Sequence, residues 1–278
     1  MSPTLPRRIA AHRADGPDDR WTWVRDDLAR TGVVLAHASI TAWQGAFPDR
    51  TERRRLLGRD WTRYRAGTGR PGNEQFLATR MLLKHLAARA LDTDPADLEL
   101  GYALSGRLYV RGCDQVDLNL SHTGDLMVVG LTSLGRIGVD VEAVDRPLYR
   151  NGTEEQMCTP AELDLLRATP EEQRNLRLVR QWTLKEAYTK ALGLGLYFPF
   201  NQFGFQVDTD PPTLHRPDGS SAEDARWSFR SLPVADGFMA GLALHRTGPG
   251  QPGDTRAATA FDPRTLGAVN RALRSAAR

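Results

Sequence analysis

Two separate stretches of this sequence constrain its fold more than any other part of the chain. The first reads I-G-V-D-V-E and begins at Ile137. Its alternation of apolar and acidic residues predicts a β-strand with Ile137, Val139 and Val141 on one face. Asp140 and Glu142 then share the opposite face. Because neighbouring carboxylates repel each other, such a face usually holds a cation.

The second stretch reads W-T-L-K-E-A-Y-T-K-A-L-G-L-G-L, begins at Trp182 and has helical spacing. Lys185 and Glu186 are adjacent, and Lys190 follows Glu186 by about one turn, near the same face of the helix. A third carboxylate with lysines beside it would suit a metal–phosphate site. All-oxygen ligands favour Mg²⁺ and also accept Mn²⁺. Taken alone, D-x-E on a strand is more often a solvated edge, and K-E on a helix a solvated ion pair.

Together the two stretches resemble the signature of the Sfp-type 4′-phosphopantetheinyl transferases, (V/I)-G-(V/I)-D-(V/I)-E followed by W-x-x-K-E-A/S-x-x-K. The resemblance implies that Asp140, Glu142 and Glu186 bind Mg²⁺. It also implies phosphate contacts for Lys185 and Lys190. The fold implied is α+β, with two similar halves related by a pseudo-twofold axis and the active site in the cleft between them.

Further matches to this family lie upstream. The run N-x-S-H ends at Ser121 and His122, which contact the phosphates of coenzyme A in the family. Arg53 occupies the position that contacts the 3′-phosphate, five places after a proline. Arg107 is the basic residue that reaches the nucleotide, although Leu108 stands where the family has proline. Without the resemblance, the histidine would be read as an exposed turn residue and the arginines as a solvated surface.

Composition sets the broad class of the chain. It is 40% hydrophobic and 26% charged, which is typical of a globular protein. No uninterrupted apolar span is long enough for a membrane helix, and no apolar segment follows the first arginines, so we expect neither a membrane anchor nor a secretory signal. The two cysteines, Cys113 and Cys158, are too few for a disulfide framework. We therefore expect free thiols and a cytoplasmic location.

The chain divides by composition and by the resemblance into four segments. We expect a loosely ordered extension over residues 1–30 and a linker with a helical tail over 247–278. Residues 31–134 form the half that contacts the coenzyme A nucleotide. Residues 135–246 form the half with the metal site and the carrier-docking region. Both halves share the order strand, short helix, long helix and antiparallel strands, without residue-level identity.

The implied activity is transfer of the 4′-phosphopantetheine group from coenzyme A to a serine of an apo acyl or peptidyl carrier protein, with release of 3′,5′-ADP. Glu186, Lys190 and His122 are the expected catalytic residues. The base is either Glu186 or a metal-activated water. The carrier is expected to dock on residues 159–166, where Leu163, Leu165 and Leu166 either form a surface or are all buried. One chain contains both halves, so we expect a monomer.

Two other classes of function fit parts of the sequence. A Mg²⁺-dependent hydrolase of nucleotide diphosphate bonds would turn over coenzyme A without a carrier protein. A basic nucleic-acid-binding module would find support only in the arginine-rich residues 50–70, and its binding would need no divalent metal and would fall steeply with salt. We expect neither nucleic acid nor membrane as a partner.

Overall fold

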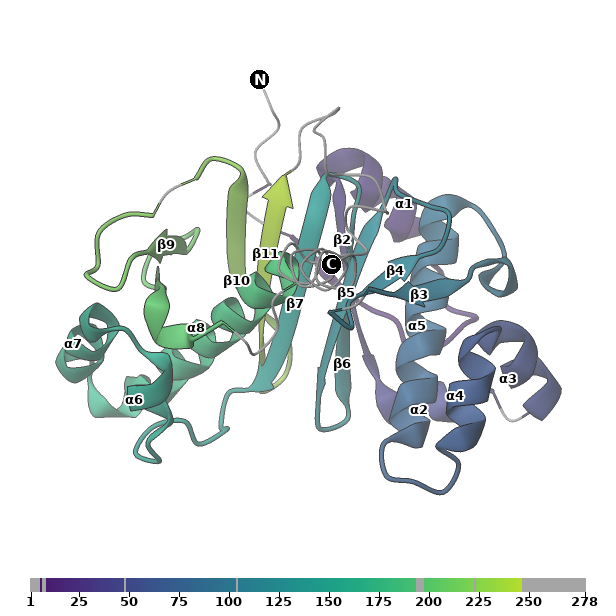
Figure 1. The fold of residues 1–278 in the computed structure, drawn as a ribbon, viewed down its shortest axis with the longest axis horizontal. Helices are drawn as coiled ribbons and strands as arrows, with labels where there is room; N and C mark the ends of the chain where they lie inside the picture. The colour runs from purple at the N-terminus through teal and green to yellow at the C-terminus, as the bar shows by residue number, and fades with distance from the viewer. Residues whose placement is uncertain are drawn as a thin grey trace, which may run out of the picture.

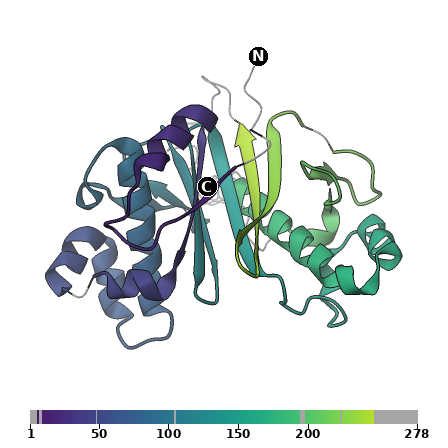
Figure 2. The same ribbon diagram turned by 180° about the vertical axis from the view of Figure 1, so that it is seen from behind.

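The structure is a computed structural model that describes residues 6, 9–47, 49–103, 105–193, 198–222 and 224–246. Figures 1 and 2 show its two sides. The sequence also predicts a helix that starts at Pro48. That residue, the last three residues of the second motif and the tail over 247–278 lie outside the described residues.

The first part of the chain builds strands, helices and one 3₁₀ turn in this order: β1 (Ala11–Arg13), α1 (Thr22–Thr31), β2 (Val33–Ser39), α2 (Ile40–Gly45), α3 (Arg50–Leu57), α4 (Asp60–Ala66), α5 (Asn73–Leu91), η1 (Pro95–Asp97), β3 (Leu100–Tyr102), β4 (Leu108–Val110), β5 (Asp117–Thr123) and β6 (Leu126–Thr132). β1, β2, β6 and β5 form one sheet in that order, and β3 pairs with β4. The described helix nearest Pro48 begins at Arg50 and is capped by the Asp49 carboxylate.

The second part builds a matching series: β7 (Gly135–Ala143), α6 (Thr153–Met157), α7 (Pro160–Ala168), α8 (Glu171–Leu192), η3 (Phe200–Gln202), β8 (Gly204–Gln206), β9 (Thr213–His215), β10 (Trp227–Ala235) and β11 (Phe238–Arg246). β10, β11 and β7 form the second sheet, and β8 pairs with β9. The α7 start is a capping box between Thr159 and Glu162, as the sequence predicts for the threonine.

The two halves share one strand topology. Apart from β1, the two main sheets have the same pairing. In the first, β2 pairs antiparallel with β6, and β6 with β5. In the second, β7 pairs antiparallel with β11, and β11 with β10. A long helix, α5 or α8, covers the outer face of each sheet (Figure 1). This is the predicted α+β fold of two similar halves.

The two sheets enclose a shared apolar core. Ile137, Val139 and Val141 of β7 are buried there, together with Val33 and Leu35 of β2. The prediction that these three β7 residues occupy one face is therefore confirmed. The opposite face of β7 is turned to α8, and it carries Asp140 and Glu142.

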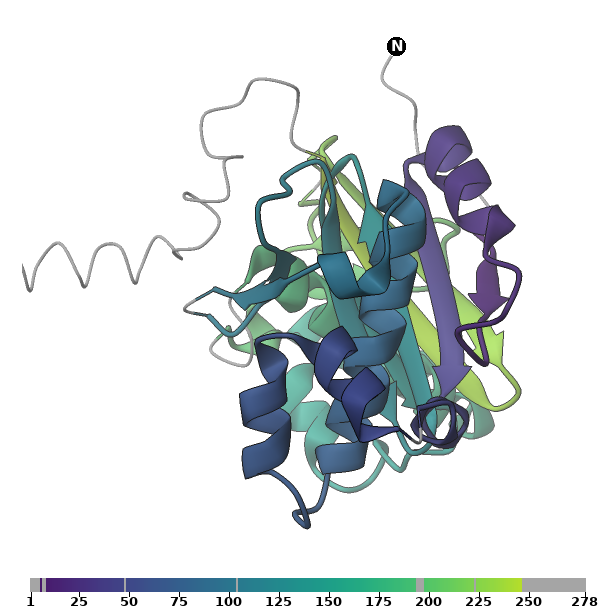
Figure 3. The same ribbon diagram turned by 90° about the vertical axis from the view of Figure 1, so that its right-hand side faces the viewer.

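The prediction for residues 1–30 is wrong where the structure describes them. β1 pairs parallel with β2, and α1 packs beside it (Figure 3). Trp21 and Val24 are buried in the core that α5 covers, and Trp43 Nε1 donates to Ala14 O at 2.6 Å. Burial of this apolar surface orders the segment although its sequence is rich in arginine and aspartate.

No helix in the described part of the chain is long and apolar enough to span a membrane.

Candidate active site

The two halves meet where β5 lies along β7. Alternate side chains of β5 make the contacts with β7: Asp117, Asn119, Ser121 and Thr123. The first two accept hydrogen bonds of 2.9 Å from backbone N–H groups of β7. The last two donate their hydroxyls to Asp140 and Glu142, at 2.6 and 2.8 Å. Polar side chains thus join the sheets and lead directly to the two acidic residues.

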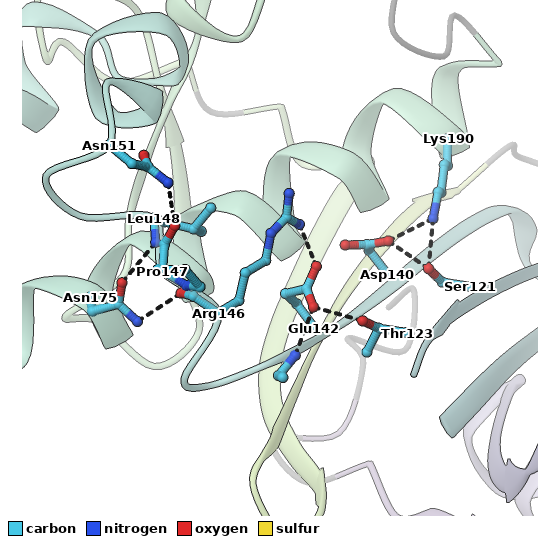
Figure 4. Close-up of polar contacts among 11 residues, drawn as sticks. Ser121, Thr123, Asp140, Glu142, Arg146, Pro147, Leu148, Asn151, Asn175 and Lys190 are labelled. Atoms are coloured by element: carbon cyan, nitrogen blue, oxygen red, sulfur yellow. Dashed lines mark hydrogen bonds and ion pairs between the residues drawn. The ribbon is translucent and has the colours of Figure 1, made fainter. Parts of the chain in front are cut away.

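Asp140 is surrounded by groups from both halves. It is 6% exposed, and its Oδ1 accepts from Ser121 Oγ at 2.6 Å and from Lys190 Nζ at 2.7 Å. Lys190 also donates to Ser121 Oγ at 3.0 Å and to Val139 O at 3.2 Å. Figure 4 shows these side chains converging from β5, β7 and α8. The structure therefore brings together three residues that the sequence analysis selected from separate motifs.

Glu142 has a different set of partners. Its Oε1 accepts from Thr123 and, at 2.9 Å, from the N–H of Ala143. Its Oε2 forms an ion pair with Arg146. The Arg146 guanidinium also lies 4.5 Å from the ring centroid of Trp182 on α8. Arg146 lies outside the sequence motifs, and the only hint of its role in the sequence is the presence of a basic residue four places after Glu142.

Glu186 faces this cluster from α8 without a partner of its own. Within the described part of the chain, its carboxylate makes no hydrogen bond and no ion pair. Burial raises its pKa, and the negative charge of Asp140 raises it further, while Lys190 and Arg146 oppose the shift.

Asp140, Glu142 and Glu186 have the oxygen donors that a divalent metal ion prefers, although their carboxylates do not converge on one position. Among the described residues, no three His, Cys, Asp or Glu side chains are gathered as metal ligands. Lys190 and Arg146 account for this, because they hold the carboxylates of Asp140 and Glu142. The donors are all oxygen, as hard cations prefer, and Glu186 remains free to bind one.

A pocket of about 340 Å³ opens beside the cluster, on the α5 side of β5. It is lined by residues of α5, β4, β5 and their flanking loops, among them Gln75, Arg80 and His122. Gln75 Nε2 lies 2.8 Å from His122 Nδ1. His122 is exposed, yet desolvation lowers its pKa, and Lys190 lowers it further. A neutral ring that accepts at Nδ1 can donate from Nε2 to a phosphate.

Size alone does not select the site. A recess of about 540 Å³ between α1 and the end of α5 is larger, but its lining contains none of the residues of this cluster.

Comparison with known proteins identifies the family. Residues 136–243 match the family model of the 4′-phosphopantetheinyl transferase superfamily. A phosphopantetheinyl transferase of Thraustochytrium sp. is 29% identical over 185 residues, which cover 60% of this chain and 62% of that protein. A Synechocystis protein provisionally named 4′-phosphopantetheinyl transferase is 34% identical over 169 residues, covering 59% of this chain and 67% of that protein. This chain belongs to the 4′-phosphopantetheinyl transferase superfamily.

The similarity to these relatives covers only part of each protein: the matched segments span 62% and 67% of their lengths. The holo-[acyl-carrier-protein] synthase of Thermotoga maritima is a solved structure that aligns with 41% of this chain and 64% of its own, at 23% identity and a TM-score of 0.32.

One phosphate contact expected for this phosphopantetheinyl transferase family member is contradicted. Lys185 is fully buried, and its Nζ donates to Glu162 Oε2 at 2.6 Å and to three backbone carbonyls, those of Met157, Phe200 and Phe203. Five helical positions correspond to a rotation of about 500°, so the side chains of Lys185 and Lys190 leave the helix in directions about 140° apart. The ammonium group is enclosed by protein, so it cannot position phosphate oxygens.

The two expected nucleotide contacts are engaged within the protein. The Arg107 side chain is 9% exposed, forms an ion pair with Asp117 and donates to Lys190 O and Ile137 O. Arg107 lines the pocket near His122 and also joins the two halves of the transferase fold. Arg53 donates to Tyr64 Oη at 3.0 Å and does not line this pocket. Their contacts with coenzyme A stay predictions.

Of the three leucines of the expected carrier-docking region, Leu166 is buried and Leu163 packs partly against the same apolar cluster. Leu165 is 39% exposed. The alternative of core packing therefore holds for most of this stripe. Neither of the two cysteines forms a disulfide, as predicted, and burial raises the pKa of Cys158 to about 12.

Proposed function

We propose that this chain transfers the 4′-phosphopantetheine group of coenzyme A to a serine hydroxyl of an apo carrier protein, with release of 3′,5′-ADP. The observation that carries the proposal is the meeting of Ser121, Asp140 and Lys190 from three elements of the two halves (Figure 4). The phosphopantetheinyl transferase sequence motifs lie on these same elements.

The reaction breaks the diphosphate of coenzyme A, so negative charge must be neutralised on both phosphates. Lys190 is a 25%-exposed ammonium that can turn from Asp140 to a phosphate oxygen. The lowered pKa of His122 favours its neutral ring, which can donate a hydrogen bond from Nε2 to a phosphate. The pocket beside it accepts the nucleotide, with Arg107 as the proposed cation of its lining and Ser121 as a further phosphate contact. Arg53 is proposed to contact the 3′-phosphate from outside this lining.

The acceptor serine must lose a proton as it attacks phosphorus. Glu186 is the only carboxylate of the cluster that has no internal partner in the described structure, and its raised pKa makes it a stronger base than an ordinary glutamate. Mg²⁺ or Mn²⁺ at Asp140, Glu142 and Glu186 supplies charge neutralisation at the diphosphate when it is bound. An ion held by these residues would also activate a water, which is the alternative base.

The carrier protein is proposed to approach at α7, where Leu165 and Arg167 are exposed. Carrier proteins are acidic, so Arg167 can steer the encounter. We place the reaction in the cytoplasm.

The first prediction tests this reaction. Incubation of the protein with coenzyme A, Mg²⁺ and an apo carrier protein should add one phosphopantetheine mass to the carrier, detected by intact-protein mass spectrometry. Asp140→Ala should lower the rate of transfer by about a hundredfold or more. It removes a ligand of the proposed metal ion, which would neutralise negative charge on the reacting phosphates.

A carrier whose acceptor serine is replaced by alanine is the matched control and should gain no mass. Cleavage of coenzyme A at the same rate with and without the carrier would favour the hydrolase instead. Full transfer by Asp140→Ala in the presence of EDTA would overturn the metal assignment.

A further inference from the structure

Arg146 is a charged residue at the site for which the proposed reaction has no role. It follows β7, four residues after Glu142, and its guanidinium binds Glu142 Oε2. Its side chain is 37% exposed, whereas that of Glu142 is 11% exposed. The ion pair therefore forms at the edge of the site, with the carboxylate inside and the cation toward solvent.

The position of Arg146 is built into the fold. Its guanidinium lies over the Trp182 ring on α8, a cation–π contact at 4.5 Å. Asn175, also on α8, fixes the backbone around it. The Asn175 amide donates to Val144 O at 3.1 Å and to Arg146 O at 2.9 Å, and its oxygen accepts from two further N–H groups of the same loop, those of Leu148 and Tyr149. Figure 4 shows this loop held against the helix.

Arg146 occupies the oxygen through which Glu142 would bind a metal. Glu142 Oε1 already accepts from Thr123 and from the Ala143 N–H. Oε2 is thus the oxygen left for a metal ion, and Arg146 covers it. By contrast, in the described structure the second oxygen of Asp140 and both carboxylate oxygens of Glu186 have no hydrogen-bond partner.

The charges of the cluster also indicate that it binds a divalent cation weakly in this state. Asp140 pairs with Lys190 and Glu142 with Arg146, so among the described residues Glu186 is the carboxylate of the three that has no cation paired with it. A site in this state attracts a divalent cation less strongly than three free carboxylates would. When the diphosphate of coenzyme A arrives with the ion, it offers both cations a new negative partner.

We propose that Arg146 is a built-in competitor of the divalent metal ion for Glu142, which keeps metal binding weak until the diphosphate substrate arrives. The inference rests on the proposed metal site at Asp140, Glu142 and Glu186. In it, Asp140 and Glu186 make the first contacts with the ion, and Glu142 joins after its ion pair with Arg146 opens. Trp182 and Asn175 keep Arg146 at the rim of the site, where it can bind the arriving phosphate.

Binding of Mn²⁺ alone tests this without any transfer reaction. The dissociation constant of Mn²⁺ is measured by electron paramagnetic resonance for the full chain and for Arg146→Gln, with and without coenzyme A. Without coenzyme A, Arg146→Gln should bind Mn²⁺ about tenfold more tightly, because a positive charge a few ångströms from the ion is removed. Coenzyme A should then tighten Mn²⁺ binding less in the variant than in the natural chain.

Arg150→Gln is the matched control. Arg150 lies in the same loop, pairs with Glu171 at 2.9 Å and stacks on Tyr149, but has no contact with Glu142. It should leave Mn²⁺ binding unchanged. Equal Mn²⁺ affinity for the natural chain and Arg146→Gln, with binding still lost in Asp140→Asn, would overturn the role of Arg146 and leave the proposed metal site standing. Mn²⁺ binding that does not depend on Asp140 would overturn both the role of Arg146 and the proposed metal site. The transfer reaction itself is tested separately, by modification of the carrier.

Discussion

Two lysines of one helix have different roles in this chain. On α8, Lys185 is fully buried and paired with Glu162, whereas Lys190 reaches Asp140 at the surface of the site. Glu162 is itself held at three places, because it also accepts from the N–H groups of Thr159 and Phe205. Lys185 therefore links α7, α8 and the start of β8, and it supports the site without reaching it.

Replacing Lys185 should therefore affect stability. Lys185→Met leaves the Glu162 carboxylate buried and unpaired, and we expect a loss of about 3–5 kcal/mol in the free energy of unfolding, measured by urea denaturation. Lys185→Met combined with Glu162→Gln should recover part of this loss, because the uncompensated charge is gone. A fully stable Lys185→Met variant with weakened coenzyme A binding would instead restore the phosphate-binding role.

At the scale of elements, α8 packs so closely on the second sheet that the strand positions facing it have no room for a side chain. A Cβ at Gly138 would overlap the carbonyl oxygen of Ala187, and a Cβ at Gly241 would overlap that of Thr183. The two glycines lie opposite the helix on neighbouring strands, β7 and β11. This close packing sets the depth at which Glu186 and Lys190 face Asp140.

A methyl group at Gly138 should force α8 away from β7. We expect Gly138→Ala to lower the free energy of unfolding by about 3 kcal/mol, the upper range for overpacking, because the group it meets is rigid helix backbone. Carrier modification should fall as well in the folded fraction. Gly45→Ala is the control, since nothing lies within 4 Å of its added Cβ and it should cost little. Similar stability of the two variants would show that the helix can shift at low cost.

At the scale of the whole molecule, the site belongs to neither half alone. Ser121 and His122 come from the first sheet, while Asp140, Glu186 and Lys190 come from the second half. The side chains of β5 and the Arg107 guanidinium join the halves at this point. One chain therefore carries every residue of the proposed site.

This completeness predicts an active monomer with one coenzyme A per chain. Sedimentation velocity at the concentration used for carrier modification should give a single species of about the chain mass of 30.9 kDa. Titration with coenzyme A should saturate at one equivalent. Activity that appears only as a dimer forms would show that a second copy contributes to the site.

Local patterns in the sequence were sufficient for the elements that carry the site. Alternation predicted the buried face of β7, and the helical spacing of the second stretch predicted the part of α8 that carries Glu186 and Lys190. The order of elements predicted the two halves. These features depend on neighbours along the chain, because strand and helix periodicities decide which side chains share a face.

Tertiary contacts decided the rest, since a charge does not reveal its distant partner. Arg80 and Lys84 of α5 could equally have been solvated or phosphate-binding, yet both are buried, with Asp60 and Leu56 O as their partners. The arginine-rich N-terminus is ordered by Trp21 in the core. The sequence selected Asp140, Glu142 and Glu186 as candidate metal ligands. Only the fold decided that Lys190, fifty residues further along the chain, holds Asp140, and that Arg146 turns back to Glu142 beside Trp182, because an ion pair depends on which side chains the tertiary structure brings within reach.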